Sequence, residues 1–177
     1  MSNSLENSRL AALRALLSQK EIDGILVSGP SSRRYLSGFT ADDSDWGALL
    51  ITPAAAALLT DFRYQLWAQQ EAPAFQIVIY KVSLGETLAG LLQEYKVQRL
   101  GFEASHVTYK GYQRLTESVR SKGVEVEWRP LEGVVEELRE AKAPEELTSM
   151  RRALDRSETV LRQVAGELAP GKTERQV

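Results

Sequence analysis

Three short stretches of the 177-residue sequence carry residue types that could do chemistry. The first is the run Gly29–Arg34, which follows a predicted strand and opens a predicted helix. Backbone N–H groups at such a place can bind an anion. The run has neither the Walker spacing nor the GxGxxG spacing of phosphate-binding loops. We therefore interpret it as a helix start capped by serine, with Arg33 and Arg34 in solvent.

The second stretch, from Asp42 to Asp45, concentrates three carboxylates and suggests a calcium loop. An EF-hand requires a bidentate glutamate at its twelfth position. That position falls on Pro53 when counted from Asp42 and on Ala54 when counted from Asp43. We interpret the stretch as an acidic, solvated loop. The functional alternative is a loop that reaches a ligand or a partner, with Trp46 as an aromatic wall.

The third candidate is His106, the only histidine, which lies in a connection after a predicted strand. We interpret it as a satisfied or exposed side chain. With one histidine, no cysteine and scattered carboxylates, the chain lacks the usual ligands of a tight transition-metal site. The sequence therefore predicts no catalytic residue and no metal site in this chain.

Composition excludes several classes of function. The 22 Lys and Arg residues are balanced by 24 Asp and Glu residues, and a net charge of −2 lacks the basic field of nucleic-acid-binding proteins. No apolar stretch approaches the roughly 20 residues of a membrane span. Charged residues interrupt the first twenty positions, so no signal peptide is expected. We expect a cytoplasmic protein that binds neither nucleic acid nor membrane.

Helices and strands alternate along the first 130 residues and must position these candidates. The predicted strands are 25–27, 47–52, 55–60, 75–80, 100–103 and 124–128. The predicted helices are 5–20, a helix capped by Asp61, 86–95 and 109–119. This alternation is typical of an α/β sheet with helices on both faces. The hairpin around Pro53 makes the sheet mixed, and Trp67 and Trp128 are predicted core residues.

After Trp128 the pattern is helical. Pro144 suits the first turn of a new helix, which Pro170 and Gly171 end. Thr173 to Gln176 then has the spacing of a capping box, which predicts the start of another helix at the end of the given sequence. We predict a domain over residues 1–130, a helical connector over 131–170 and the cut start of a further domain over 171–177.

One face of the connector helix carries apolar residues at alternating spacings of three and four. They are Leu147, Met150, Leu154, Leu161, Val164 and Leu168. We expect this stripe to pack on a missing domain or, in the isolated chain, to pair between chains.

Several motifs follow one another in a recognisable order. They are Arg9-Leu10 with Asp23–Val27, Tyr35–Thr40, Thr60–Tyr64 with Ala68, and Leu100–Glu103, followed in the tail by Leu138-Arg139, Lys142, Pro144–Leu147, Met150-Arg151, Ala153 and Pro170–Glu174. The ordered set, which covers essentially the whole chain, resembles the N-terminal domain of the Xaa-Pro aminopeptidase, prolidase and creatinase family. The resemblance implies the creatinase-type α/β fold, a mixed, mostly parallel sheet with helices on both faces, followed by a helical connector.

In that family the active site lies in a C-terminal domain, where two Asp, one His and two Glu bind a pair of divalent metals such as Mn, Co or Zn. The resemblance implies that none of these ligands belongs to this chain, whose domain is non-catalytic. It also implies a homodimer in which this domain helps to wall the neighbouring subunit's active site. The expected partners are its own C-terminal catalytic domain and small proline-containing peptides.

The resemblance places four residues near the substrate of the parent enzyme: Ser32, Phe39, Asp43 and Trp46. Two departures bear on them. Ser32 stands where the family often has Asn or Asp, and the loop 41–46 is more acidic than the common version, which contains Gly and Ser. Two alternatives stay open: a non-enzymatic α/β module that binds a ligand or a protein, and a fragment of a creatinase-type amidinohydrolase.

Overall fold

The computed structural model describes residues 2–41 and 47–176. The chain divides into two compact units, residues 1–139 and residues 140–177. Each unit is described by itself.

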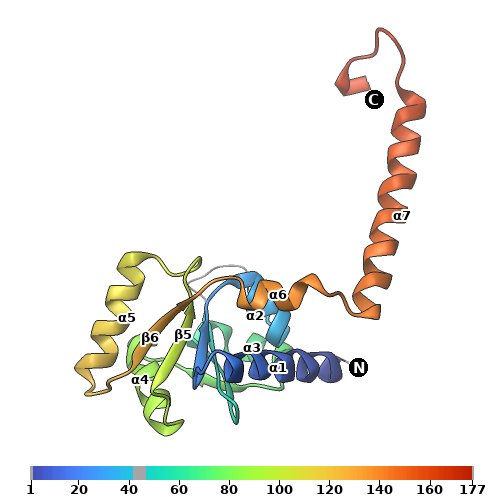
Figure 1. The fold of residues 1–177 in the computed structure, drawn as a ribbon. Helices are drawn as coiled ribbons and strands as arrows, with labels where there is room; N and C mark the ends of the chain where they lie inside the picture. The colour runs from blue at the N-terminus through green and yellow to red at the C-terminus, as the bar shows by residue number, and fades with distance from the viewer. Residues whose placement is uncertain (1, 42–46, 177) are drawn as a thin grey trace. The chain divides into compact units, whose positions relative to one another are not determined.

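A mixed sheet of six strands forms the centre of the first unit (Figure 1). Its strands are β1 (Gly24–Val27), β2 (Ala48–Ile51), β3 (Ala56–Thr60), β4 (Gln76–Ile79), β5 (Arg99–Glu103) and β6 (Glu127–Leu131). They lie in the order β4-β3-β2-β1-β5-β6. The pairs β3–β4, β1–β5 and β5–β6 are parallel, whereas β1–β2 and β2–β3 are antiparallel. The predicted hairpin and the predicted mostly parallel sheet are confirmed.

Helices cover both faces of this sheet, as the sequence predicted. One face packs against α1 (Ser2–Gln19), α2 (Pro30–Ser37), α3 (Gln65–Glu71) and α6 (Val134–Glu140), and the other against α4 (Leu84–Glu94) and α5 (Tyr109–Ser121) (Figure 1). Successive side chains of a strand point to opposite faces. Accordingly Ile25 and Val27 of β1 belong to the first hydrophobic cluster, whereas Leu26 belongs to the second.

The last strand differs from its prediction. β6 begins at Glu127 and reaches Leu131, whereas the sequence predicted a strand over 124–128. Gly123 has a positive φ of 73° at the end of α5, and the N–H of Val124 donates to the carbonyl oxygen of Val119. Val124 therefore closes the helix end instead of opening the strand. Pro130 is tolerated because β6 is an edge strand, paired with β5 alone in the described sheet.

The first unit continues beyond β6 into α6. Val134 and Val135 are buried in the same cluster as α1 and α2. The hydroxyl of Tyr35 donates to the carbonyl oxygen of Leu138 at 3.0 Å. These contacts make α6 part of the first unit's packing.

The second unit consists of α7 (Pro144–Glu167) and a short 3-10 turn, η3 (Glu174–Gln176). As predicted, Pro144 occupies the first turn of its helix. The N–H of Ala143 donates to the carboxylate of Glu146, and the N–H of Thr173 donates to Gln176 Oε1, both at 2.9 Å. Side chains therefore satisfy the backbone at both helix starts.

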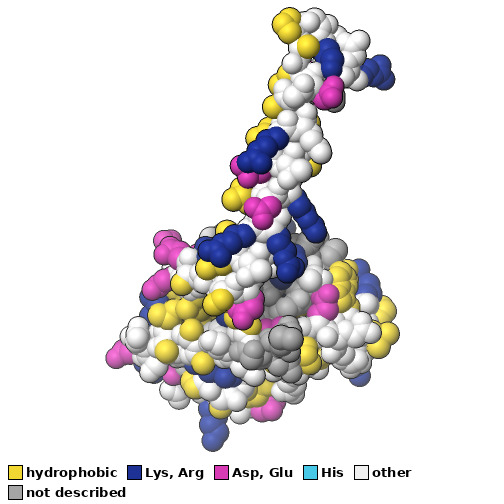
Figure 2. All heavy atoms as spheres, turned by 90° about the vertical axis from the view of Figure 1, so that its right-hand side faces the viewer, with side chains coloured by type: hydrophobic (Ala, Val, Ile, Leu, Met, Phe, Trp, Pro, Cys, Tyr) yellow, Lys and Arg dark blue, Asp and Glu magenta, His cyan; other side chains and the backbone are white. Residues whose placement is uncertain are grey.

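Apolar side chains recur along α7 and stay exposed (Figure 2). Leu154 is 66% exposed, Leu161 68% and Val164 39%. No helix in the described part of the chain combines the length and the apolar character needed to cross a membrane.

Candidate functional site

The segment predicted to approach a substrate begins on α2. Gly29 is the N-cap residue of this helix and Pro30 follows in its first turn, so no serine caps the helix start. Arg33 is fully buried, which contradicts the prediction that both arginines lie in solvent. Its guanidinium donates to the carbonyl oxygen of Ala41 at 2.9 Å and to that of Gly47. One side chain thus binds the backbone on both sides of residues 42–46.

Of the four residues predicted near a substrate, two are described. Ser32 and Phe39 are both fully buried in the first unit. The hydroxyl of Ser32 has no hydrogen-bond partner within residues 2–41 and 47–176. The ring of Phe39 meets Trp67 edge-on, with 5.9 Å between ring centroids. Asp43 and Trp46 lie outside the described residues.

The two tryptophans that were predicted as core differ. Trp67 is 38% exposed, so the core prediction is wrong for this residue: α3 presents it at the rim of the first cluster. Trp128 is partly buried and meets the rings of Phe102 and Tyr112, with centroids 6.1 and 5.9 Å away.

Thr40 is fixed to the end of α3. Its N–H donates to the carboxylate of Glu71 at 2.8 Å, and its hydroxyl donates to the same group. Burial raises the pKa of Glu71, but hydrogen bonds from Thr40 and Trp67 and the charge of Arg34 outweigh it, so the pKa lies below its ordinary value. The ionised carboxylate therefore holds the segment next to residues 42–46.

Asp61 organises the turn between β3 and α3. It caps the short 3-10 helix η2 (Phe62–Tyr64) by accepting from the N–H of Arg63 at 2.8 Å. The predicted capping role is thus confirmed for this turn, whereas α3, which carries Trp67 and Ala68, has Tyr64 as its N-cap residue. The guanidinium of Arg63 returns to the same carboxylate at 2.6 Å, and these bonds lower the pKa of Asp61. The turn leaves Phe62 76% exposed and Leu66 74% exposed. With Trp67 they form an apolar surface on η2 and α3.

A cluster of three ionisable side chains lies at the carboxyl end of β5. Among the described residues, Glu103, His106 and Glu136 are the one group of three side chains whose ligand atoms approach closely enough to hold a metal ion. Sequence reasoning missed this group. Glu103 and His106 are three residues apart after a strand, which is a weak local signal. Glu136 gives none, because only the packing of α6 brings it there.

This cluster does not match the two-metal centre that the resemblance implies. That centre needs two Asp, one His and two Glu, whereas the cluster offers one His and two Glu. The described residues therefore do not fit a pair of metals, and no hydrolytic step can be assigned to them.

Comparisons with known proteins give a consistent result. A family model described as the creatinase/prolidase N-terminal domain matches residues 9–141. The "Uncharacterized peptidase YqhT" of Bacillus subtilis is 31% identical over 166 residues, which is 94% of this chain and 45% of that protein.

Solved structures extend the likeness to three dimensions. An Xaa-Pro dipeptidase from Bacillus anthracis matches 97% of this chain and 46% of its own length, with a TM-score of 0.86 and 29% identity. The N-terminal domain of the cytoplasmic peptidase PepQ from Mycobacterium tuberculosis matches 74% of this chain and 98% of its own length, with a TM-score of 0.65 and 34% identity. The chain thus spans about half the length of YqhT and of the dipeptidase.

Proposed function

The chain belongs to the creatinase/prolidase N-terminal domain family, and from this we propose that it is the non-catalytic N-terminal part of a metal-dependent Xaa-Pro aminopeptidase or dipeptidase. One observation carries the proposal. The Xaa-Pro dipeptidase from Bacillus anthracis matches 97% of this chain, so the matched region must include part of α7. The chain, in turn, spans only 46% of that enzyme. The hydrolytic chemistry then belongs to a C-terminal catalytic domain that holds two divalent metal ions, Mn, Co or Zn.

The division of labour follows from the ligands that the chain offers. A two-metal hydrolase clamps the attacking and leaving oxygens between its metals. The three side chains gathered at Glu103, His106 and Glu136 are too few to bind such a pair. Within residues 2–41 and 47–176, the donors therefore agree with a non-catalytic role for the chain and a catalytic role for the proposed C-terminal domain.

We further propose that residues 32–46 approach the substrate, a small proline-containing peptide, at the active-site mouth of the neighbouring subunit. Asp43 and Trp46 would make the contact. Ser32 and Phe39 are buried, so they would support the segment by packing and would not contact the substrate directly. Arg33 and Glu71 hold the same segment through hydrogen bonds to its backbone. A rigid scaffold that presents a loop is the usual arrangement for recognition.

The exposed apolar surface of Phe62, Leu66 and Trp67 supports the homodimer, because side chains exposed in one chain can be covered by a partner. For the connector we propose residues 131–170, of which α6 packs within the first unit and α7 leads toward the catalytic domain, whose start we place at 171–177. We place the protein in the cytoplasm, where PepQ is described to be.

The proposal is tested by expressing the complete coding sequence beside the 177-residue chain and assaying both with Xaa-Pro and matched Xaa-Ala peptides in Mn²⁺, Co²⁺ or Zn²⁺. We expect the complete product to cleave the Xaa-Pro bond selectively and the 177-residue chain to cleave neither peptide. A complete product that leaves Xaa-Pro peptides intact in all three metals would refute the peptidase. It would favour a binding module instead.

A further inference from the structure

In the carboxylate of Glu103, one oxygen accepts hydrogen bonds from the backbone and the other accepts none from the described residues. Glu103 ends β5 and is only 4% exposed. Its Oε2 accepts from the N–H groups of Ser28 and Gly29, both at 2.7 Å. Its Oε1 is buried and has no hydrogen-bond partner in the described part of the chain. A buried acceptor that makes no bond destabilises a fold, so this oxygen is free to accept a ligand.

The imidazole of His106 is held beside that carboxylate. The backbone N–H of His106 donates to the backbone carbonyl oxygen of Glu103 at 3.1 Å, which turns the chain back toward the end of β5. The ring lies so close to Gly29 that a Cβ added there would be 2.6 Å from His106 Cδ2. Glycine at position 29 therefore makes room for the ring.

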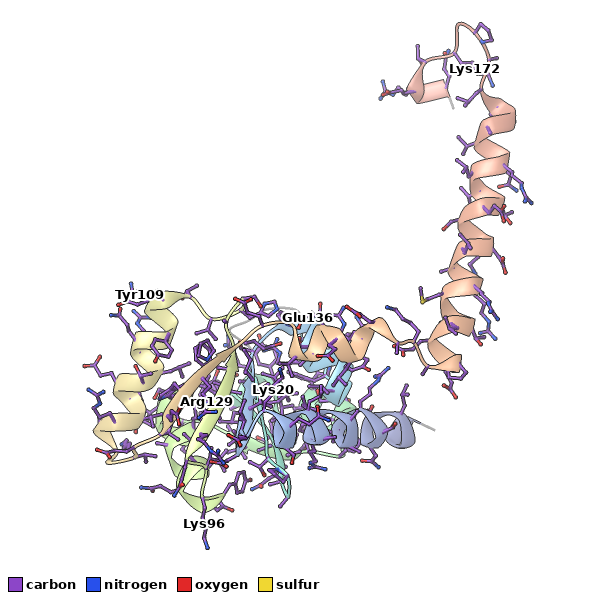
Figure 3. The ribbon with its side chains drawn as sticks, viewed as in Figure 1. Lys20, Lys96, Tyr109, Arg129, Glu136 and Lys172 are labelled. Carbon is purple, nitrogen blue, oxygen red and sulfur yellow. The ribbon has the colours of Figure 1, made fainter. Side chains whose placement is uncertain are left out.

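The third group comes from another element. Glu136 lies in the first turn of α6 (Figure 3), and its Oε1 is 3.8 Å from His106 Nε2. The ligand atoms of Glu103, His106 and Glu136 all lie within 4.8 Å of one another. Ligands around one tetrahedral metal at about 2.1 Å are roughly 3.4 Å apart. The His106 and Glu136 side chains, 34% and 43% exposed, have the freedom to close that difference.

We propose that Glu103, His106 and Glu136 bind a single divalent cation, with Zn²⁺ favoured over Mg²⁺ and Ca²⁺. An imidazole nitrogen with two carboxylate oxygens suits Zn²⁺, whereas Mg²⁺ and Ca²⁺ prefer oxygen ligands alone. The N–H groups of Ser28 and Gly29 fix the Glu103 carboxylate, as outer partners fix the ligands of metal sites. His106 also lines a pocket of ≈ 350 Å³ with Ser28, Thr108 and Arg114.

The bound ion would tie the end of β5 to α6, the first helix of the proposed connector. The proposal departs from the sequence prediction of no metal site, because counting donors in the sequence does not show which of them meet. It does not depend on the proposed function, since all three ligands belong to this chain.

The experiment is calorimetric titration of the 177-residue chain, purified without a polyhistidine tag, with Zn²⁺ and in parallel with Mg²⁺. We expect one Zn²⁺ per chain, no comparable response to Mg²⁺, and an unfolding temperature raised by roughly 5 °C or more at saturation. Because His106 is the only histidine, its imidazole NMR signals report on the site alone and should shift with the same saturation curve.

The variants His106→Gln and Glu136→Gln should each weaken Zn²⁺ binding by roughly 10-fold or more, because each removes one of three ligands. Glu137→Gln is the matched control, since Glu137 is an exposed neighbour on the same helix that is not in the cluster. Two results would overturn the proposal: no saturable Zn²⁺ binding by the unaltered chain, or binding that persists unchanged in both His106→Gln and Glu136→Gln.

Discussion

Thr40 donates two hydrogen bonds to Oε2 of Glu71, one from its backbone N–H at 2.8 Å and one from its hydroxyl at 2.9 Å. The pair joins the chain that follows α2 to the last residue of α3. Gly38, two residues before Thr40, also packs closely on Glu71: it has a φ of 80°, and a Cβ built on it would be 2.8 Å from the carbonyl oxygen of Glu71. The approach to residues 42–46 is therefore fixed by close packing as well as by charge.

The first prediction concerns Glu71→Gln. At pH 7 the variant should lose about 1–2 kcal/mol of unfolding free energy, because an amide accepts these bonds less strongly than a carboxylate. The folded pKa of Glu71 lies below the ordinary 4.5, so its contribution is present above pH 4.5 and is lost as pH falls through the folded pKa. Urea unfolding between pH 7 and pH 3 should show the difference from the unaltered chain shrinking in acid.

Glu117→Gln, at an exposed position of α5, is the control and should show no such pH-dependent difference. A difference for Glu71→Gln that stays constant into acid would contradict the assignment of the lowered pKa to these hydrogen bonds.

The second prediction compares two adjacent arginines. Arg33→Met should destabilise the chain by about 2–4 kcal/mol, because it leaves the carbonyl oxygens of Ala41 and Gly47 without their donor. Arg34→Met, at the exposed neighbouring position, should change the unfolding free energy by about 0.5 kcal/mol or less. Equal effects in chemical denaturation would show that Arg33 does not hold the backbone of Ala41 and Gly47 in place.

The third prediction uses three glycines. Gly123→Ala should cost about 1 kcal/mol, because its φ of 73° disfavours a side chain although nothing lies within 4 Å of the new Cβ. Gly38→Ala should cost roughly 2–4 kcal/mol, since it adds a close contact with Glu71 to the same backbone conformation.

Gly90→Ala, in α4 with open space around it, should instead stabilise the chain by about 0.5–1 kcal/mol. Thermal or urea unfolding of the three variants measures the order. A Gly38→Ala variant no less stable than Gly123→Ala would show that the contact with Glu71 relaxes without strain.

The fourth prediction concerns self-association through α7. Burying a large apolar side chain contributes about 1.5–3 kcal/mol, and Leu161 and Val164 are both exposed in the stripe. We expect sedimentation to show a dimer or larger species that weakens in the double variant Leu161→Lys/Val164→Lys. The control Thr159→Lys/Gln163→Lys adds the same charge to the other face of α7 and should leave association unchanged. A chain that is monomeric at every concentration would exclude pairing through the stripe.

The fifth prediction concerns the complete product that the proposed function implies. Asp43→Asn should change KM for Xaa-Pro peptides while the unfolding temperature stays the same, if residues 32–46 approach the substrate. Phe39→Ala is a poorer probe, because Phe39 is fully buried and its truncation should also destabilise the fold by about 3–5 kcal/mol. Glu117→Gln again serves as the control. Unchanged kinetics of Asp43→Asn on peptides of several lengths would contradict the proposal that residues 32–46 approach the substrate.

Much of the fold was predictable because its signals are local. The hairpin around Pro53, the cap at Asp61 and the helix start at Pro144 each depend on residues within a few positions of one another. The two-faced sheet follows from apolar strands that alternate with helices, since such strands need covering on both sides. β6 was misplaced because Val124 and Val126 read as a strand, while the hydrogen bond from Val124 to Val119 belongs to the end of α5.

The tertiary structure alone decided which polar residues act together. Arg33 and Arg34 are adjacent and identical in the sequence, yet one is buried against the sheet and the other is exposed, because α2 turns only one of them inward. Glu103 and Glu136 meet beside His106 only because β5 ends where α6 packs across the same edge. A sequence determines the donors and acceptors that a chain carries; which of them meet depends on packing between elements far apart in the chain, and no local pattern encodes it.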